Sequence, residues 1–226
     1  MRSFALSLAG AAAIAFLAAP AQAEDKFTYM TNWYAQAEHG GFYQAVAQGI
    51  YKKYGLDVTI KMGGPQVNIT QMMAAGQADC IMGSSDIQMM QVREGGVPVV
   101  NVAAFFQKDP QVLIAHDDVK GFEDLKGKTL LIGAQANRGY WPWLKAKFGL
   151  KDEQTRPYTF NIQPFVADKN TAQQGYLTSE PYAIQKAGVK STVLMFSDHG
   201  FPAYATTVSC ICLLYTSPSP RDKRQS

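Results

Sequence analysis

The amino-acid sequence predicts an α/β protein of two lobes, each with a mainly parallel sheet flanked by helices. Short apolar segments alternate with amphipathic segments from residue 26 to 198, which is the order typical of parallel sheets. The pattern restarts at residues 107–118, which separates a first series from a second. Extended crossings are expected at 106–111 and 199–204. Two crossings are typical of a hinge, and the cleft between two hinged lobes is the default ligand site.

The N-terminal residues 1–23 are interpreted as a secretory signal peptide. Arg2 precedes an apolar segment from Phe4 to Leu17, and the small residues Ala21 and Ala23 mark a cleavage site. The apolar segment is too short to predict a transmembrane helix. We therefore expect a soluble protein exported to a bacterial periplasm.

The C-terminal residues 212–226 differ in character from the rest of the chain. Back-translated, the segment from Cys212 to Asp222 resembles a sequencing-library adapter, so these residues are interpreted as read-through. The alternative is a disordered tail rich in proline and serine. Under the first interpretation, the authentic chain is cut short near Ile211.

The charge balance excludes several classes of partner. The whole chain has 21 basic and 18 acidic residues, but without the two ends 17 of each remain. A neutral protein gives no support for a nucleic-acid partner or an anionic membrane surface. The cysteines that remain, Cys80 and Cys210, indicate no clear disulfide framework.

The first lobe is predicted to span residues 24–108. Its first strand alternates Phe27, Tyr29 and Trp33 with polar residues, and the helix that follows is expected to stop at Gly55. Further strands are expected at 56–62, 79–85 and 97–106, with helices at 67–78 and 86–96.

The second lobe is predicted to span residues 109–198, followed by a return crossing to the first lobe at 199–211. Strands are expected at 112–115, 128–134, near 156–163 and at 191–196. Helices are expected at 121–127, 140–150 and 171–188.

The loop after the first strand is the leading candidate for ligand binding. Trp33 and Tyr34 offer flat faces for stacking on a planar ring, and His39 can donate or accept a hydrogen bond. Gly41 leaves a backbone N–H open near the start of a helix. The alternative is that Trp33 covers the core and His39 is a surface residue.

Two later loops also join a strand to a helix. Ser84 and Ser85 are expected both to cap the following helix and to contact ligand. In the second lobe, Gln135, Asn137 and Arg138 present donors, and Tyr140 and Trp141 offer a second aromatic wall. For Arg138, a solvent-exposed position is the favoured alternative.

Other chemistry is not indicated by the sequence. The three histidines and Cys80 lack the spacing of zinc ligands, and phosphate-binding and nucleophile motifs are absent. We therefore expect no metal, no cofactor and no enzymatic activity.

Several segments together resemble one family. "NWYAQAEHGGFYQAVAQGIYKKYGLDVTI", "GGPQ", "MAAGQADCIMGSSD", "GFEDLKGKTLLIG" and "GYLTSEPYAIQKAG" are similar to the SsuA/THI5-like (NMT1-like) substrate-binding proteins over residues 26–208. The resemblance implies the type II periplasmic-binding-protein fold, a monomer, a small-molecule ligand and an ABC permease as partner. In that fold the chain returns to the first lobe and continues, so an incomplete first lobe with exposed apolar surface is expected here.

The resemblance implies pyrimidine precursors of thiamine, riboflavin-like compounds, sulfonates including taurine, or nitrate as ligands. Glu180, on a turn before Pro181, can accept two N–H bonds from an aminopyrimidine and would repel a sulfonate. This favours a planar nitrogen heterocycle, with sulfonate or nitrate as the alternative. Two other classes stay open. One is a THI5-like pyrimidine synthase, whose cysteine-rich stretch this chain lacks, and the other is a sensor domain.

Overall fold

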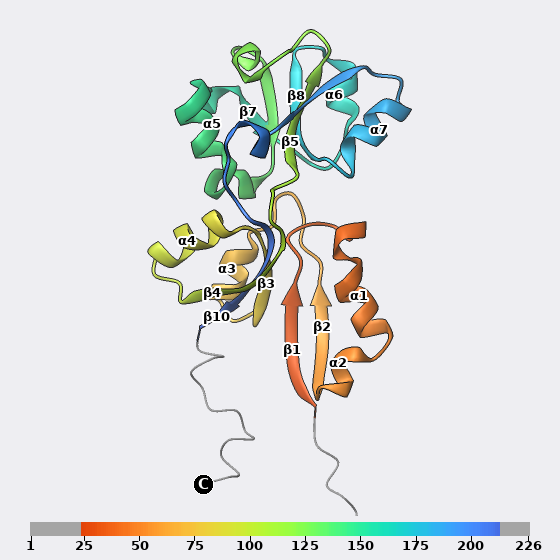
Figure 1. The fold of residues 1–226 in the computed structure, drawn as a ribbon, viewed down its shortest axis with the longest axis vertical. Helices are drawn as coiled ribbons and strands as arrows, with labels where there is room; N and C mark the ends of the chain where they lie inside the picture. The colour runs from red at the N-terminus through yellow and green to blue at the C-terminus, as the bar shows by residue number, and fades with distance from the viewer. Residues whose placement is uncertain (1–23, 213–226) are drawn as a thin grey trace, which may run out of the picture.

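The computed structural model describes residues 24–212, which form two lobes joined by two crossings (Figure 1). The expected signal peptide and all of the expected read-through except Cys212 lie outside the described residues. Each lobe is built on one five-stranded sheet with helices packed on it. The predicted α/β fold with two lobes is therefore confirmed.

The sheet of the first lobe has the strand order β2-β1-β3-β10-β4. Its strands are β1 (Asp25–Met30), β2 (Leu56–Lys61), β3 (Cys80–Ser85), β4 (Val99–Phe106) and β10 (Ala205–Ile211). Its helices are the 3-10 helix η1 (Ala37–His39), α1 (Gly40–Ala47), α2 (Ile50–Lys53), α3 (Ile69–Ala74) and α4 (Asp86–Glu94). The single helix expected to run to Gly55 is divided into α1 and α2, because Gly49 between them has a φ of 64°. Gly55, with a φ of 75°, follows the second helix directly before β2.

The sheet of the second lobe has the strand order β7-β6-β8-β5-β9. Its strands are β5 (Gln111–His116), β6 (Thr129–Ile132), β7 (Thr155–Pro157), β8 (Thr171–Tyr176) and β9 (Ser191–Met195). Its α-helices are α5 (Tyr140–Phe148), α6 (Gln163–Ala167) and α7 (Glu180–Lys186). Its 3-10 helices are η2 (Phe122–Leu125), η3 (Ala134–Arg138), η4 (Asp152–Gln154) and η5 (Ser197–His199).

The two sheets have the same topology, although no internal repeat is visible in the sequence. In each, four strands run parallel and one strand runs antiparallel to both of its neighbours. The antiparallel strand is β10 in the first sheet and β5 in the second. Each is the strand that enters from the other lobe, so the two crossings interlock the lobes (Figure 1).

Apolar side chains cover both faces of each sheet. In the first lobe, Met30, Ile81 and Val99 pack against α3 and α4 through Met73 and Met89. In the second lobe, α5 packs on one face and α6 and α7 on the other. The faces of both sheets are therefore fixed, and with them the loops at the ends of the strands.

Some apolar side chains are exposed at one edge of the first sheet. Val102 and Phe105 of the edge strand β4 are 41% and 56% exposed. The ring of Phe105 contacts Phe42 of α1, at a distance of 5.2 Å between ring centroids.

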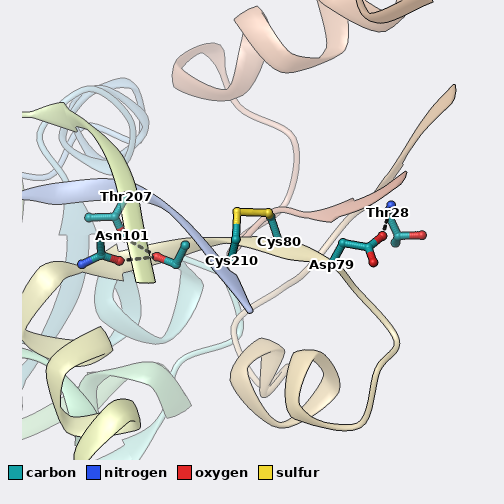
Figure 2. Close-up of a disulfide and its surroundings, with 7 residues drawn as sticks. Thr28, Asp79, Cys80, Asn101, Thr207 and Cys210 are labelled. Atoms are coloured by element: carbon teal, nitrogen blue, oxygen red, sulfur yellow. Dashed lines mark hydrogen bonds between the residues drawn. A yellow bond between two sulfur atoms is a disulfide. The ribbon is translucent and has the colours of Figure 1, made fainter. Parts of the chain in front are cut away.

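A disulfide joins the return strand to the sheet of the first lobe, which the sequence did not predict. Cys80 of β3 and Cys210 of β10 are directly opposite each other in the antiparallel register, and both are buried (Figure 2). The two cysteines are separated by 130 residues in the sequence, so their pairing could not be predicted from spacing. Beside it, Ser209 donates a hydrogen bond to Asn101 of β4 at 2.6 Å.

The predicted helix at 171–188 is wrong in its first part, where β8 lies in the centre of the second sheet. The segment "TAQQGY" lacks the apolar residues by which buried strands are recognised. At Gly175 of this strand a side chain would not fit, since an added Cβ would lie 2.6 Å from Ile114 Cδ1. The strand predicted near 156–163 is also shorter than expected, and the helix predicted at 121–127 is the 3-10 helix η2.

Candidate functional site

The candidate site is a cleft between the lobes, at the ends of the strands of both sheets. Its cavity volume is about 50 Å³, because the lobes contact each other across it. It is lined by Asn32, Trp33, Gln36, Glu38, His39, Ser84, Gln111, Gly133, Gln135, Ala136, Gln174, Gly175, Tyr176, Glu180 and Thr206. Ligand pockets usually occupy about 300–1,000 Å³, so a ligand of several rings requires the lobes to move apart.

Trp33 lies on the loop that follows β1 and contacts the opposite lobe. Thr31, which is fully buried, donates a hydrogen bond from its Oγ1 to the carbonyl of Trp33 at 2.9 Å and so holds this loop. The indole ring is stacked on Tyr158 of the second lobe, with centroids 6.0 Å apart and an interplanar angle of 17°. Trp33, which lines the cleft, thus also holds the two lobes together through its contact with Tyr158.

His39 closes the first-lobe side of the cleft at the end of η1. Its side chain is only 2% exposed, and burial lowers the pKa of its imidazole below the usual value. At neutral pH the ring is therefore uncharged, with one donor and one acceptor nitrogen. Its Nδ1 is buried and has no hydrogen-bond partner among the described residues.

Glu180 lies at the start of α7, and its carboxylate points back towards the cleft. Its Oε1 accepts from the hydroxyl of Tyr158 at 2.8 Å, and its Oε2 accepts from the backbone N–H of Tyr176 at 2.8 Å. Burial raises the pKa of this carboxyl, while the two donors lower it by less. Each carboxylate oxygen keeps a second lone pair with which it can accept from a ligand.

Gln135 of η3 joins the lobes directly. Its Nε2 donates to the carbonyl of Asn32 at 2.7 Å, and its Oε1 accepts from the hydroxyl of Ser84. Tyr176 Oη of β8 and Thr206 Oγ1 of β10 also share a hydrogen bond between the lobes, at 3.1 Å. Two more link loops of the two lobes. They run from Gln66 Nε2 to the carbonyl of Tyr158 at 3.1 Å and from the N–H of Ala134 to the carbonyl of Pro65 at 3.0 Å.

The structure brings five of the predicted site residues together in this cleft: Trp33, His39, Ser84, Gln135 and Glu180. Tyr34 lies beside them, 39% exposed, and packs on Phe160 at 5.6 Å between ring centroids. Their contact with a ligand remains a prediction.

The other predicted residues do not line the cleft. Gly41 lines a separate surface cavity beside Phe42 and Phe105, and Ser85 caps α4 by accepting from Gln88 N at 3.2 Å. Tyr140 and Trp141 are 2% exposed in the core of the second lobe, where their polar atoms bond to Gln174 and Asp152. The sequence of an aromatic pair at a helix start does not show which side of the helix will be buried. Here both rings pack in the apolar core of the second lobe.

Asn137 and Arg138 are exposed and line a second cavity between the lobes. The exposed position of Arg138 agrees with the alternative that the sequence analysis favoured for this residue. Gln135, three residues earlier on η3, is shared by both cavities.

Sequence reasoning missed most of the polar lining of the cleft. The residues not predicted include Asn32, Gln36, Glu38, Gln111, Gln174, Tyr176 and Thr206. Gln174 of β8 accepts from Tyr140 Oη at 2.9 Å and from the N–H of Gly133. One signal in the sequence could have indicated that this segment is not a helix. Two adjacent glutamines followed by a glycine supply no apolar face for a helix to bury.

Within residues 24–212, no group of three His, Cys, Asp or Glu side chains is arranged to hold a metal ion. The helices of this range are also too short or too polar to cross a membrane.

The interlocked sheets and the cleft between them define a two-lobed type II periplasmic-binding-protein fold. The E. coli periplasmic aliphatic sulphonate binding protein SsuA superposes with a TM-score of 0.61 at 12% identity, covering 90% of this chain and 66% of that one. The family model described as NMT1/THI5 like matches residues 36–213. The chain therefore belongs to the NMT1/THI5-like family.

Two curated relatives carry different names. A 4-amino-5-hydroxymethyl-2-methylpyrimidine phosphate synthase of Aspergillus parasiticus is 26% identical over 110 residues, which is 47% of this chain and 32% of the relative. The riboflavin-binding protein RibY of Chloroflexus aurantiacus is 23% identical over 180 residues, which is 76% of this chain and 51% of the relative. The matches thus span about a third to a half of the length of these relatives.

Proposed function

We propose that this protein is an exported, monomeric solute-binding protein that closes its lobes on a small planar nitrogen heterocycle and delivers it to an ABC permease. The ligand is a pyrimidine of the thiamine-precursor kind or a riboflavin-like compound. The observation that supports this most is the charge of the cleft. Glu38 and Glu180 line it, and no lysine or arginine is among the described residues that do.

This lining disfavours an anionic ligand. A sulfonate or nitrate entering the cleft would meet carboxylates at short range, where a low dielectric strengthens the repulsion. His39 offers no compensating charge, because burial lowers its pKa and keeps the ring neutral. A sulfonate or nitrate carrier remains the alternative within the same role.

The cleft instead presents acceptors and an aromatic face to a ligand. Glu180 has spare lone pairs, and the buried Oδ1 of Asn32 has no partner among the described residues. The amino group and ring N–H of a heterocycle supply matching donors, and its flat face suits stacking on Trp33. Each missing donor would leave a buried acceptor unpaired, which gives selectivity.

The disulfide supports export. Disulfides persist in oxidising compartments such as the bacterial periplasm and are rare in the cytosol. The bond between Cys80 and Cys210 is therefore consistent with the signal peptide read from the sequence. The similarity to SsuA and RibY, both named as binding proteins, also supports the carrier role.

A calorimetric binding panel tests the proposal. We expect 4-amino-5-hydroxymethyl-2-methylpyrimidine or riboflavin to bind, and taurine, an alkanesulfonate and nitrate to show no heat. Glu180→Gln should weaken binding by about tenfold, because it removes an acceptor at a charged site. Glu153→Gln, an exposed change on the same lobe, is the matched control. Binding of sulfonates or nitrate alone would overturn the ligand assignment.

A second candidate is pyrimidine synthesis, which the names of several relatives favour. Extracts of cells that express the protein, and of matched cells that do not, would be analysed by mass spectrometry for this pyrimidine. Our proposal predicts no pyrimidine product. Formation of one, in an amount that follows the amount of protein, would favour the enzyme instead.

A further inference from the structure

Tyr158 lies directly after β7 and is connected to the cleft only through its neighbours. It is 1% exposed and is not among the residues that line the cleft. Its backbone N–H donates to the carbonyl of Ile132 of β6 at 2.9 Å, which fixes it to the second sheet. Any effect of Tyr158 on a ligand must therefore act through another side chain.

Two contacts join Tyr158 to the first lobe. Its carbonyl accepts from Gln66 Nε2 at 3.1 Å, and its ring is stacked on Trp33. Gln66 lies between β2 and α3, and Trp33 follows β1, so two separate loops of the first lobe contact one residue of the second. These contacts exist only while the lobes are together.

The hydroxyl of Tyr158 holds the carboxylate of Glu180. Oε1 accepts from this hydroxyl at 2.8 Å and Oε2 accepts from Tyr176 N at 2.8 Å, so each carboxylate oxygen has one donor from the protein. A carboxylate held at both oxygens cannot rotate freely, and its remaining lone pairs keep one direction. Both side chains are buried, where the loss of a hydrogen bond to a charged group costs the most.

We propose that Tyr158 is a positioning residue that links contact between the lobes to the ligand-binding geometry of Glu180. Its ring and carbonyl contact the first lobe, while its hydroxyl directs the carboxylate. Closure of the lobes thus holds Tyr158 from one side, and Tyr158 holds Glu180 from the other. The effect on a ligand rests on the proposed function, but the hydrogen bond to Glu180 can be tested without a ligand.

Removal of the hydroxyl changes the balance between the two protonation states of Glu180. The hydroxyl donates to the ionised carboxylate and so lowers its pKa, against burial, which raises the pKa by more. Tyr158→Phe should therefore raise the pKa further and keep Glu180 protonated to a higher pH. The other titratable groups near Glu180 and across the cleft stay in place in this variant: Tyr140, Tyr176, Asp109, Glu38 and His39.

The first test follows the Glu180 carboxyl directly, in protein without ligand. Protein with ¹³C-labelled glutamate carboxyls is titrated with pH by NMR, and the spectrum of Glu180→Gln identifies the signal. We expect the midpoint to be about one pH unit higher in Tyr158→Phe than in wild type. Tyr182→Phe, the same change at an exposed tyrosine of α7, is the matched control and should leave the midpoint unchanged. A wild-type midpoint in Tyr158→Phe would overturn the proposal.

Calorimetric titration with 4-amino-5-hydroxymethyl-2-methylpyrimidine at successive pH values tests the effect on the ligand. An N–H donor of the ligand is best accepted by the ionised carboxylate, so affinity should fall as the pH drops through the pKa of Glu180. Tyr158→Phe should bind about tenfold more weakly than wild type below the wild-type midpoint, with a smaller deficit above it. A role in packing alone would weaken binding equally at every pH, and that result would contradict positioning. If wild type binds no pyrimidine, the proposed function fails, while the NMR titration still decides the role of Tyr158.

Small-angle X-ray scattering without ligand separates the role of the ring from that of the hydroxyl. Tyr158→Phe keeps the stacked ring and should have the wild-type radius of gyration, whereas Tyr158→Leu removes the stack and should have a larger one. Thermal melting checks that both variants are folded, and Trp33→Leu removes the same stack from the other lobe if Tyr158→Leu is not. Variants without the stack that stay as compact as wild type would overturn the link between the lobes and Glu180.

Discussion

Asp109 shows how a single residue in a crossing is placed under electrostatic strain. It lies between β4 and β5 and is 1% exposed. Its Oδ1 accepts from Gln111 N at 2.9 Å, but its buried Oδ2 has no partner among the described residues. Burial, with a smaller contribution from the charge of Asp86, raises the pKa of this carboxyl to about 7.

The first prediction is that Asp109 makes stability depend on pH. Between about pH 4 and pH 7 the folded protein holds the proton more tightly than the unfolded chain does, so raising the pH across this window lowers stability. The loss is of the order of 4 kcal/mol at most. Asp109→Asn keeps the acceptor for Gln111 and should flatten the profile, measured by urea unfolding at successive pH values.

Asp117→Asn, an exposed change nearby in sequence, is the control for this experiment. Glu180 contributes with the same sign, since burial raises its pKa too. The informative quantity is therefore the difference between the profiles of wild type and Asp109→Asn. Identical profiles for the two proteins would show that Asp109 titrates in its ordinary range.

The second prediction concerns Gly175, which pairs with Val112 of β5 in the second sheet. Gly175→Ala should destabilise the protein by about 1–3 kcal/mol, because its Cβ would lie 2.6 Å from Ile114 Cδ1 in a packed core. Gly40→Ala is the matched control, since nothing lies within 4 Å of its added Cβ. Chemical denaturation of both variants measures the difference, and equal stabilities would contradict the packing argument.

At the scale of elements, β10 is the strand on which the first lobe depends. It lies between β3 and β4 and is antiparallel to both. The disulfide and the hydrogen bond from Ser209 to Asn101 fix it from the two sides (Figure 2). A strand that enters from the other lobe has no short turn to hold it, so these side-chain links set its position.

The third prediction is that the disulfide stabilises the protein by about 2–5 kcal/mol. It closes a loop with a sequence separation of 130 residues, and a long loop loses the most entropy in the unfolded chain. Urea unfolding would compare wild type with the double variant Cys80→Ala and Cys210→Ala. Cys212→Ser, at the free cysteine, is the control. If the double variant unfolds at the same urea concentration as wild type, the bond contributes nothing.

Sequence patterns predicted the elements that follow simple periodicity. β1 alternates apolar and polar residues, and α5 begins and ends close to the predicted limits. β8 was missed because its buried side chains, Gln173 and Gln174, are polar and have no apolar pattern. The pairing of Cys80 with Cys210 depends on which strands are neighbours, which only the three-dimensional arrangement determines.

The candidate site was predictable only in part. Trp33 follows a predicted strand whose end faces the cleft, so its position could be inferred. Glu180 was proposed from the turn before Pro181 alone, because the strand that precedes it was predicted as a helix. Tyr140 and Trp141 could not be placed, because the direction of a side chain at a helix start depends on how the helix rotates against its sheet. The amide side chains of the cleft give no chemical motif, and their convergence appears only when the two lobes meet.

At the scale of the whole molecule, the lobes are held together by few direct contacts. Gln135 makes two of them, to Asn32 and Ser84. Gln66, Ala134 and the hydroxyl of Tyr176 each add one hydrogen bond, and Trp33 stacks on Tyr158. Since each lobe has its own core, these contacts and the ligand decide how far the lobes are apart.

The fourth prediction is that Gln135→Ala opens the protein. The loss of two hydrogen bonds shifts the equilibrium between closed and open forms by about 1–3 kcal/mol. Small-angle X-ray scattering without ligand should then give a larger radius of gyration than for wild type. Gln185→Ala, an exposed change on α7, should leave it unchanged. A closed Gln135→Ala protein would mean that other contacts hold the lobes.

The most direct test of the central claim is a crystal structure of the protein grown with 4-amino-5-hydroxymethyl-2-methylpyrimidine. We predict density for the ring in the cleft between the lobes, with its face against Trp33 and an N–H group bonded to Glu180. Density for the ring at another place, or a cleft that stays without it at a saturating concentration, would contradict the assignment of this cleft as the heterocycle site.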